Sequence, residues 1–265
     1  MRVVNYQCET RLPHETFAVT DRPVQPEFAP ERPLSAYLLG ALDFDSLLAL
    51  QRRLVYDISG DRDSAALVLC EHPSGITVGR EGSAAHVRPN ATELAARQWP
   101  VRWVGRGGGT MLHQPGQVAC YPVFALDALD LPAGRYVAEL QAVALDLCRE
   151  FGIEALPDPE HPGARANGRK VAHVGVAIHG QVSSFGLVVN VNPDLAPFRD
   201  VRCDGDPAHM TSLQRESPQR VRVSGVRQRL LELIAARFGF ARVSIFHNHP
   251  AALPRPTRHA LPHAS

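Results

Sequence analysis

The stretch 170–191, KVAHVGVAIHGQVSSFGLVVNV, decides the fold class of this chain. Its two halves, KVAHVGVAI and VSSFGLVVNV, are apolar segments rich in valine, and the turn HGQ separates them. Short runs of β-branched residues on either side of a turn are typical of neighbouring strands in a sheet. We therefore predict a pair of strands here and place the remaining elements around it.

Helical repeats and short apolar runs alternate along the rest of the chain. The predicted helices are 44–58, 92–98, 135–151 and a last one that ends at Gly239. Asp43 is predicted to cap the first of them and Ser224 the last. The predicted strands are 65–70, 76–80 and two that begin at 101 and 118. Because the order shows no regular βαβ rhythm, we expect one mixed β-sheet flanked by helices, an α/β (α+β) fold.

The two ends differ in composition from the middle. Residues 1–34 contain five prolines and no clear period, which predicts an irregular N-terminal extension. Residues 243–265 are rich in proline and histidine and predict a flexible tail, whose histidines lack the carboxylates and rigid frame of a metal site. One domain over 35–242 should therefore hold the core and the function.

Bulk properties exclude several functional classes. The net charge of +1 gives no basic field for nucleic acid or an anionic membrane, and no apolar run reaches the ~18 residues needed to span a bilayer. The five cysteines are scattered and contain no CxxC pair, so we expect neither a disulfide framework nor a zinc site. Since the start of the chain does not resemble a signal peptide, we expect a cytoplasmic protein.

The usage of basic residues singles out Lys170. Lysine and arginine together number 28, and all but this one are arginine. Arginine keeps its proton in proteins, whereas burial can lower the pKa of a lysine amine and make it a base. Lys170 therefore marks a position where a guanidinium group would not serve, although a lone surface lysine that survived by chance is the plain alternative.

Two further segments carry residues that could do chemistry. Three successive glycines in RGGGTMLHQPGQ, residues 106–117, let backbone N–H groups approach an oxyanion, carbonyl or phosphate closely, although a tight structural turn is the alternative. Cys203 lies in VRCDGDP among polar and turn residues, which predicts an accessible thiol. A thiol becomes a good nucleophile when a neighbouring base or cation lowers its pKa, and Lys170 is the candidate.

These segments resemble a known family. RGGGTMLHQPGQVACYPV (106–123) is similar to the RGGxxTxHGPGQ…YP signature of the lipoyl (octanoyl) transferases. Other matches follow in the same order from Tyr37 to Phe240: YLLGALDFDSLLALQ, EHPSGITVGR, GRKVAHVGVAI (the family's catalytic-lysine strand), FGLVVNVNPDLAPF, Cys203 at the place of the family's PCG cysteine, and Met210-Thr211-Ser212-Leu213. Three positions depart from the pattern: Phe185 replaces a histidine, Gln114 replaces a glycine, and Asp204 separates Cys203 from its glycine.

The resemblance implies the fold of the biotin/lipoate protein ligase catalytic domain and an acyltransferase activity without a cofactor or metal. The family moves octanoyl from octanoyl acyl carrier protein to lipoyl-domain proteins, such as the E2 subunits of 2-oxoacid dehydrogenases or the glycine cleavage H protein, in lipoate biosynthesis. It also implies that Cys203 forms the acyl thioester and that Lys170 is the general base that lowers the pKa of that cysteine. The implied substrate-binding residues are Arg106, Gly107, Gly108, Gly109, Thr110, Met111, Leu112, His113, His173, Val174, Gly175, Gly186, Leu187 and Val188.

Other functions are open at this point. An ATP-dependent lipoate protein ligase shares the fold and a key lysine but does not need Cys203, and an octanoyl amidotransferase would differ in its donor. A non-catalytic acyl-binding protein is a further alternative, because a carboxylate beside the thiol, as at Asp204, disfavours the thiolate.

Overall fold

The computed structural model describes residues 32–206 and 209–252. Within them, eight strands form one mixed sheet in the order β11-β1-β2-β6-β10-β9-β8-β7, and three form a small sheet in the order β4-β3-β5. The strands are β1 Pro33–Ala41, β2 Ala65–Glu71, β3 Gly75–Val78, β4 Val101–Trp103, β5 Thr110–His113, β6 Gln117–Val123, β7 Ala155–Pro157, β8 Gly163–Ala166, β9 Arg169–His179, β10 Val182–Asn190 and β11 Arg242–Phe246. The expected mixed sheet is confirmed.

The predicted strand pair forms the middle of the large sheet. β9 and β10 pair antiparallel from Val182 opposite His179, and the turn between them places Gly180 and Gln181 at positive φ. All nine residues of β10 are buried, because the strand has β6 and β9 on its two edges and helices over its faces. The valine-rich composition of this stretch therefore reflects burial on both faces.

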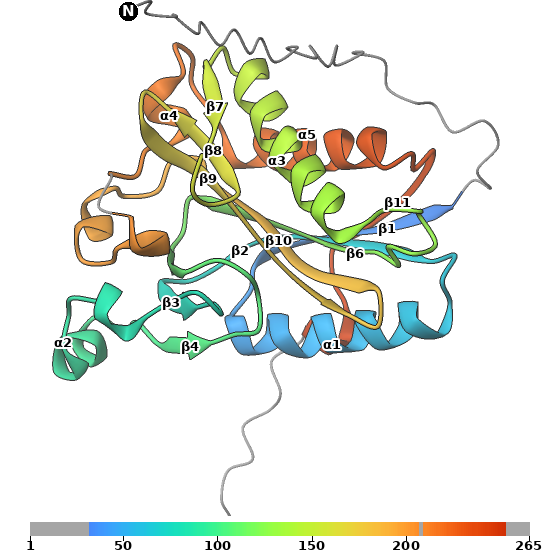
Figure 1. Ribbon diagram of the computed structural model, residues 1–265, viewed down its shortest axis with the longest axis horizontal. Coiled ribbons are helices and arrows are strands. Elements are labelled where there is room, and N and C mark those ends of the chain that lie inside the picture. The colour runs from blue at the N-terminus through green and yellow to red at the C-terminus, as the bar shows by residue number, and fades with distance from the viewer. Residues whose placement is uncertain (1–31, 207–208, 253–265) are drawn as a thin grey trace, which may run out of the picture.

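Helices cover both faces of the large sheet (Figure 1). α1 (Phe44–Gly60) lies on one face, where its buried stripe packs against even-numbered residues of β2 such as Val68. α3 (Ala133–Glu150) and α5 (Val223–Arg237) lie on the opposite face over residues such as Leu67 and Leu69. Successive residues of β2 contact opposite layers of helices because successive side chains of a strand point to opposite faces of the sheet. The shorter helices are α2 Ala91–Ala96, α4 Leu213–Glu216, and the 3₁₀ turns η1 Ala84–His86, η2 Ala196–Arg199, η3 Cys203–Gly205 and η4 Pro250–Ala252.

Helix starts test the predicted caps. Asp43 accepts a hydrogen bond of 2.9 Å from the backbone N–H of Ser46, so the predicted cap of α1 is confirmed. The predicted cap of the last helix is wrong, because α5 begins at Val223 with Arg222 in the capping position, and Ser224 lies inside its first turn.

The predicted end of the domain is wrong at its C-terminal side. β11 covers residues 242–246 and pairs in parallel with β1. Residues 243–246, which were expected to lie in the flexible tail, are therefore part of the sheet. The ring of Phe246 stacks on that of Tyr37 at 5.3 Å, which explains how this edge strand is held. β1 likewise begins at Pro33, two residues before the expected boundary, and residues 1–31 and 253–265 lie outside the described part.

The small sheet brings distant segments together beside β9. An apolar cluster joins Ile76 of β3 and Leu112 of β5 to Phe198, Cys203 and Met210, so η3 packs onto β5. The loop before β5 reaches β9, where the Gly107 N–H donates to the carbonyl of Val176 at 2.8 Å. The start of β9, the glycine loop and η3 therefore meet at one place.

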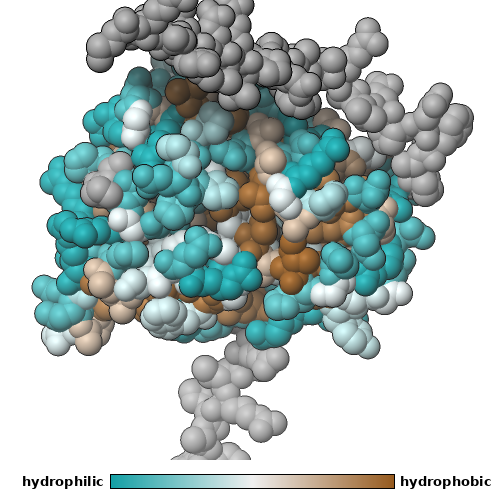
Figure 2. Space-filling model, viewed as in Figure 1, coloured by the Kyte–Doolittle hydropathy of each residue, from teal (hydrophilic) through white to brown (hydrophobic). Residues whose placement is uncertain are grey.

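The helices in the described part of the chain differ in length and apolarity from a membrane-spanning helix. None of these described helices is long and apolar enough to cross a bilayer. On the face shown in Figure 2, hydrophilic side chains cover most of the surface and a band of apolar ones lies over the sheet between the helices.

Candidate active site

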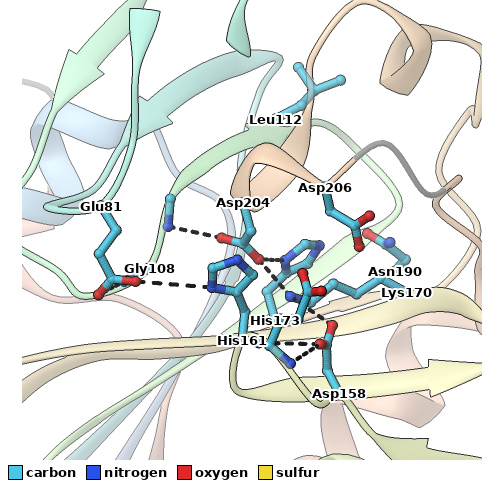
Figure 3. Close-up of polar contacts among 12 residues, drawn as sticks. Glu81, Gly108, Leu112, Asp158, His161, Lys170, His173, Asn190, Asp204 and Asp206 are labelled. Carbon is cyan, nitrogen blue, oxygen red and sulfur yellow. Dashed lines mark hydrogen bonds and ion pairs between the residues drawn. The ribbon is translucent and has the colours of Figure 1, made fainter. Parts of the chain in front are cut away.

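Lys170 is the centre of the place where the three segments meet. Its side chain is fully buried at the start of β9. The ammonium Nζ pairs with Oδ2 of Asp204 at 2.6 Å and with Oδ2 of Asp158 at 3.2 Å (Figure 3). A buried ammonium is stable only when paired, so the two carboxylates explain why the charge is tolerated.

Asp204 connects all three segments. It belongs to η3 and has a φ of 54°, in the left-handed region that aspartate tolerates better than most residues. Its Oδ2 also accepts from Nδ1 of His173 at 2.9 Å, and its Oδ1 accepts from the backbone N–H of Gly109 at 2.9 Å. Burial alone would raise the pKa of Asp204, but the hydrogen bond from His173 and the charge of Lys170 outweigh it and hold the pKa far below its usual range.

His173 is the second nitrogen base of the site. It is 2% exposed, and within the described residues its Nε2 atom has no hydrogen-bond partner. Burial lowers the pKa of His173 below its ordinary value, and the nearby charge of Lys170 lowers it further. The imidazole is therefore neutral at neutral pH, and because Asp204 is ionised, the ring proton is assigned to Nδ1.

A second carboxylate supports Lys170 from the opposite side. Oδ1 of Asp158 accepts from the backbone N–H groups of Glu160 and His161, at 3.0 and 3.2 Å. Its Oδ2 receives Nε of Arg165 at 2.9 Å, and Arg165 also pairs with Asp206 beyond η3. Asp158 was not predicted, because a carboxylate in the loop PDPEHP belongs to no periodic pattern or motif that would single it out.

The glycine loop contacts a carboxylate of the chain itself, and its binding of an acyl carbonyl stays a prediction. The N–H of Gly109 donates to Asp204, that of Gly107 to a strand carbonyl, and that of Gly108 toward Oε1 of Glu81 at 3.4 Å. A Cβ atom on Gly109 would lie 2.6 Å from Cα of Asp204, closer than real Cβ contacts occur. Glycine is therefore required at 109 for η3 to approach the loop.

Arg106 and His113 hold this loop in place. The guanidinium of Arg106 is buried and donates to Oγ1 of Thr77 at 2.8 Å and to the carbonyl of Gly109 at 3.0 Å. His113 lies in β5, with Nε2 2.9 Å from the same Thr77 hydroxyl and Nδ1 without a partner among the described residues. Residues 110–113 are thus a strand and not part of the predicted loop.

Cys203 lies beside the site, next to Asp204 in η3. The prediction of an accessible thiol is wrong, because the side chain is 1% exposed and packs into the apolar cluster of the small sheet. Burial raises the pKa of Cys203 to about 12, although the backbone N–H of Leu112 and the charge of Lys170 act in the opposite direction. The ion-pair partners that the described structure gives Lys170 are Asp158 and Asp204, not this thiol.

The remaining expected binding residues fall into two groups. Gly175 lies under the glycine loop, since a Cβ there would be 2.7 Å from the carbonyl of Gly107. The other group lies within the sheet or its core: Thr110, Met111, Leu112, Val174, Gly186, Leu187 and Val188 are buried in strands β5, β9 and β10. Gly186 allows a close approach of the β6 backbone, with the carbonyl of Cys120 2.6 Å from a Cβ built there.

Two of the positions that depart from the family pattern, Gln114 and Phe185, have structural roles outside the Lys170 site. Gln114 donates to the carbonyl of Asp194 at 2.6 Å and so ties the turn before β6 to the chain after β10. Phe185 has a φ of 58° and packs with Tyr121 in the apolar cluster under α1. Among the described residues, no group of three or more His, Cys, Asp or Glu side chains could hold a metal ion.

Comparisons with known proteins agree on one family. Residues 43–235 match the family model of the lipoyl protein ligase A/B catalytic domain. The chain is 33% identical over 211 residues to an octanoyltransferase of Roseiflexus sp. (strain RS-1), covering 78% of this chain and 88% of that one. It is 32% identical over 203 residues to an octanoyltransferase of Geobacter metallireducens, covering 76% of this chain and 90% of the relative.

Solved structures agree on the fold. A crystal structure of lipoate-protein ligase A bound with ATP superimposes with a TM-score of 0.65 at 14% identity, covering 81% of this chain and 87% of that one. A bipartite lipoate protein ligase from Thermoplasma acidophilum gives a TM-score of 0.64 at 14% identity, covering 82% and 86%. At such identities the likeness concerns the fold alone, which is the one expected from the sequence.

Proposed function

Because this chain belongs to the octanoyltransferases of the lipoyl protein ligase A/B catalytic-domain family, we propose that it transfers an octanoyl group from octanoyl acyl carrier protein to a lysine of a lipoyl domain. The family assignment made from the sequence, and with it the class of acyltransferases, is confirmed. The donor, the acceptor and the place in lipoate biosynthesis are parts of the proposal.

The observation that carries the proposal is the buried Lys170, which pairs with Asp158 and with Asp204, the carboxylate that also accepts from His173. Replacing a thioester by an amide is downhill, so the reaction needs no ATP, only a group that stabilises the charge on the carbonyl oxygen and groups that move protons. The side-chain nitrogen of Lys170 pairs with Asp204 in a buried site, where a positive charge stabilises a developing oxyanion more strongly than in water. The only lysine of the chain is thus placed where an acyl-transfer site needs a cation.

The route of the acyl group has two versions. In the version expected from the resemblance, Lys170 takes the proton of Cys203 and the thiolate becomes acylated. Burial raises the pKa of Cys203, so in this version a base must take the proton as the thiol attacks. In the other version the amine of the lipoyl domain attacks the donor thioester without an acyl-enzyme. Lys170 pairs with Asp204 and not with the thiol in the described structure, and an octanoyl group on Cys203 is the observation that separates the two versions.

The test is mass spectrometry of the intact proteins after mixing the enzyme with octanoyl acyl carrier protein and a lipoyl domain, without ATP. We expect the mass of one octanoyl group on the lipoyl domain and none on a domain whose acceptor lysine is replaced by arginine. Acylation that requires free octanoate and ATP would show a ligase instead. Acylation that requires an octanoylated protein as donor would show an amidotransferase, and binding without transfer would overturn the enzymatic proposal.

A further inference from the structure

We propose that a basic cleft beside the Lys170 site, lined by Arg169, Arg199 and Arg215, binds the phosphate of the phosphopantetheine arm on which an acyl carrier protein presents its acyl group. This inference rests on the proposed transfer from octanoyl acyl carrier protein and adds the place where the arm of that donor binds. It holds for either route of the acyl group, because it concerns the donor before any bond is broken.

The cleft is a hollow of about 270 Å³ between segments that are distant in the sequence. Arg169 lies at the start of β9, Arg199 at the end of η2 and Arg215 in α4. The apolar part of the lining includes Leu195, Phe198 and Met210. The hollow therefore combines a cationic side with an apolar one.

The charge of the cleft is positive. The described residues that line it include no Asp or Glu, and His209 is the titratable side chain besides the arginines. Arg169 pairs at 2.8 Å with Glu216, whose side chain is only 4% exposed. Within residues 32–206 and 209–252, Arg199 and Arg215 have no ion-pair partner. Two uncompensated guanidinium groups thus line one hollow, where an anion would be attracted by both.

The cleft adjoins the residues that the resemblance assigns to catalysis. Arg169 precedes Lys170 in β9, and Met210 forms a parallel β-bridge with Lys170. Phe198 and Met210, which line the cleft, belong to the same apolar cluster as the buried Cys203. An arm bound in the cleft therefore lies next to the side chains that pack around the expected nucleophile.

The chemistry of the arm matches both sides of the cleft. Phosphopantetheine has a phosphodiester where it joins the carrier protein, a carbon with two methyl groups close to that phosphate, and the acyl thioester at its far end. Guanidinium groups bind phosphate oxygens through charge-assisted hydrogen bonds, and the methyl groups fit the apolar side formed by Phe198 and Met210. An acidic side chain of the carrier protein would use the arginines alone, so the arm is the occupant that uses the whole cleft.

Inhibition by fragments of the arm tests the assignment. With octanoyl acyl carrier protein as donor and a lipoyl domain as acceptor, 4′-phosphopantetheine should compete with the donor. Its inhibition constant should be at least about 10-fold lower than that of pantetheine, because one hydrogen bond to a charged group contributes on the order of 10-fold in affinity. Pantetheine lacks only the phosphate and is therefore the matched comparison.

Arg199→Gln and Arg215→Gln test the two arginines that have no ion pair. Each should raise the KM for octanoyl acyl carrier protein by about 3–10-fold, between the effects of exposed and of buried charge pairs, and should reduce the preference for 4′-phosphopantetheine by a similar factor. The control Arg52→Gln removes an exposed arginine of α1 outside the cleft and should change neither value. Thermal unfolding of each variant shows that it is folded.

The outcomes separate this inference from the proposed function. A wild type that does not octanoylate the lipoyl domain from octanoyl acyl carrier protein overturns both. An active wild type that the two fragments inhibit equally, or that neither inhibits, overturns the inference alone. So does a double variant, Arg199→Gln with Arg215→Gln, that keeps the wild-type KM and preference. A raised KM with an unchanged preference would show that the arginines contact the carrier protein itself, which also overturns the phosphate assignment.

Discussion

Gly109→Ala is the smallest change that should misplace the carboxylate of the site. A Cβ atom at 109 would lie 2.6 Å from Cα and 3.1 Å from the carbonyl carbon of Asp204. The shorter approach must lengthen by about 0.8 Å to reach ordinary van der Waals contact, so η3 and the glycine loop must separate. Because the φ of Gly109 is not among the positive values, the substitution tests contact and not backbone strain.

This separation breaks the interactions that hold Asp204. The 2.9 Å hydrogen bond from the Gly109 N–H becomes too long, and the 2.6 Å contact of the carboxylate with Lys170 shifts with it. A displacement of about 1 Å in a catalytic arrangement costs on the order of 10²-fold in rate. Overpacking should in addition cost about 1–3 kcal/mol of unfolding free energy, which lowers Tm by a few degrees per kcal/mol at this chain length.

The assay is the rate of octanoylation of a lipoyl domain under saturating substrates, together with thermal unfolding of the variant. The matched control is Gly105→Ala in the same loop, where a Cβ would meet nothing within 4 Å, and it should leave the rate and Tm unchanged. Normal turnover in a folded Gly109→Ala protein would refute the claim that the placement of Asp204 controls the reaction.

Three further predictions concern Lys170 and its surroundings. Lys170→Arg should lower kcat by more than about 10²-fold, because a larger, planar guanidinium must fit in a fully buried, packed site. Wild-type turnover would show that any cation serves. Lys170→Met should cost about 3–5 kcal/mol in urea unfolding at pH 7, because it leaves Asp158 and Asp204 buried without their cation; a smaller loss would indicate that Arg165 and His173 suffice. The pKa of Asp204 is lower in the folded than in the unfolded chain, so its contribution to stability is present above about pH 4 and is lost as the pH falls below that value. Asp204→Asn should therefore be less stable at pH 7 and should lose stability less steeply between about pH 4 and 2. Urea unfolding free energies of the two proteins that change in parallel with pH would contradict this.

Short-range patterns in the sequence predicted most of the architecture. The apolar run of β2, the helical repeat of α1 with its Asp43 cap, and the paired stretches of β9 and β10 all lie where they were expected. These features depend on periodicity and capping, which involve residues close together in the chain. β11 was missed because a short exposed edge strand has no such pattern and is held by its pairing with β1.

The composition also drew attention to the centre of the site. A single lysine among 28 basic residues indicated Lys170, and three successive glycines indicated a close approach of backbone. Both inferences depend only on residue types, since glycine lacks Cβ and lysine differs chemically from arginine. What approaches the glycines, however, is Asp204 of the same chain.

The identity of the side chain that faces Lys170 was decided by the tertiary structure alone. Cys203 and Asp204 are neighbours, and either could be turned toward the lysine in a flexible turn. The packing of η3 on β5 buries the thiol among apolar side chains, and the positive φ of Asp204 directs its carboxylate to the ammonium. Dihedral angles in such a turn are set by contacts with distant strands, so the sequence determines the elements and the reactive residue types, whereas long-range packing determines which of them meet.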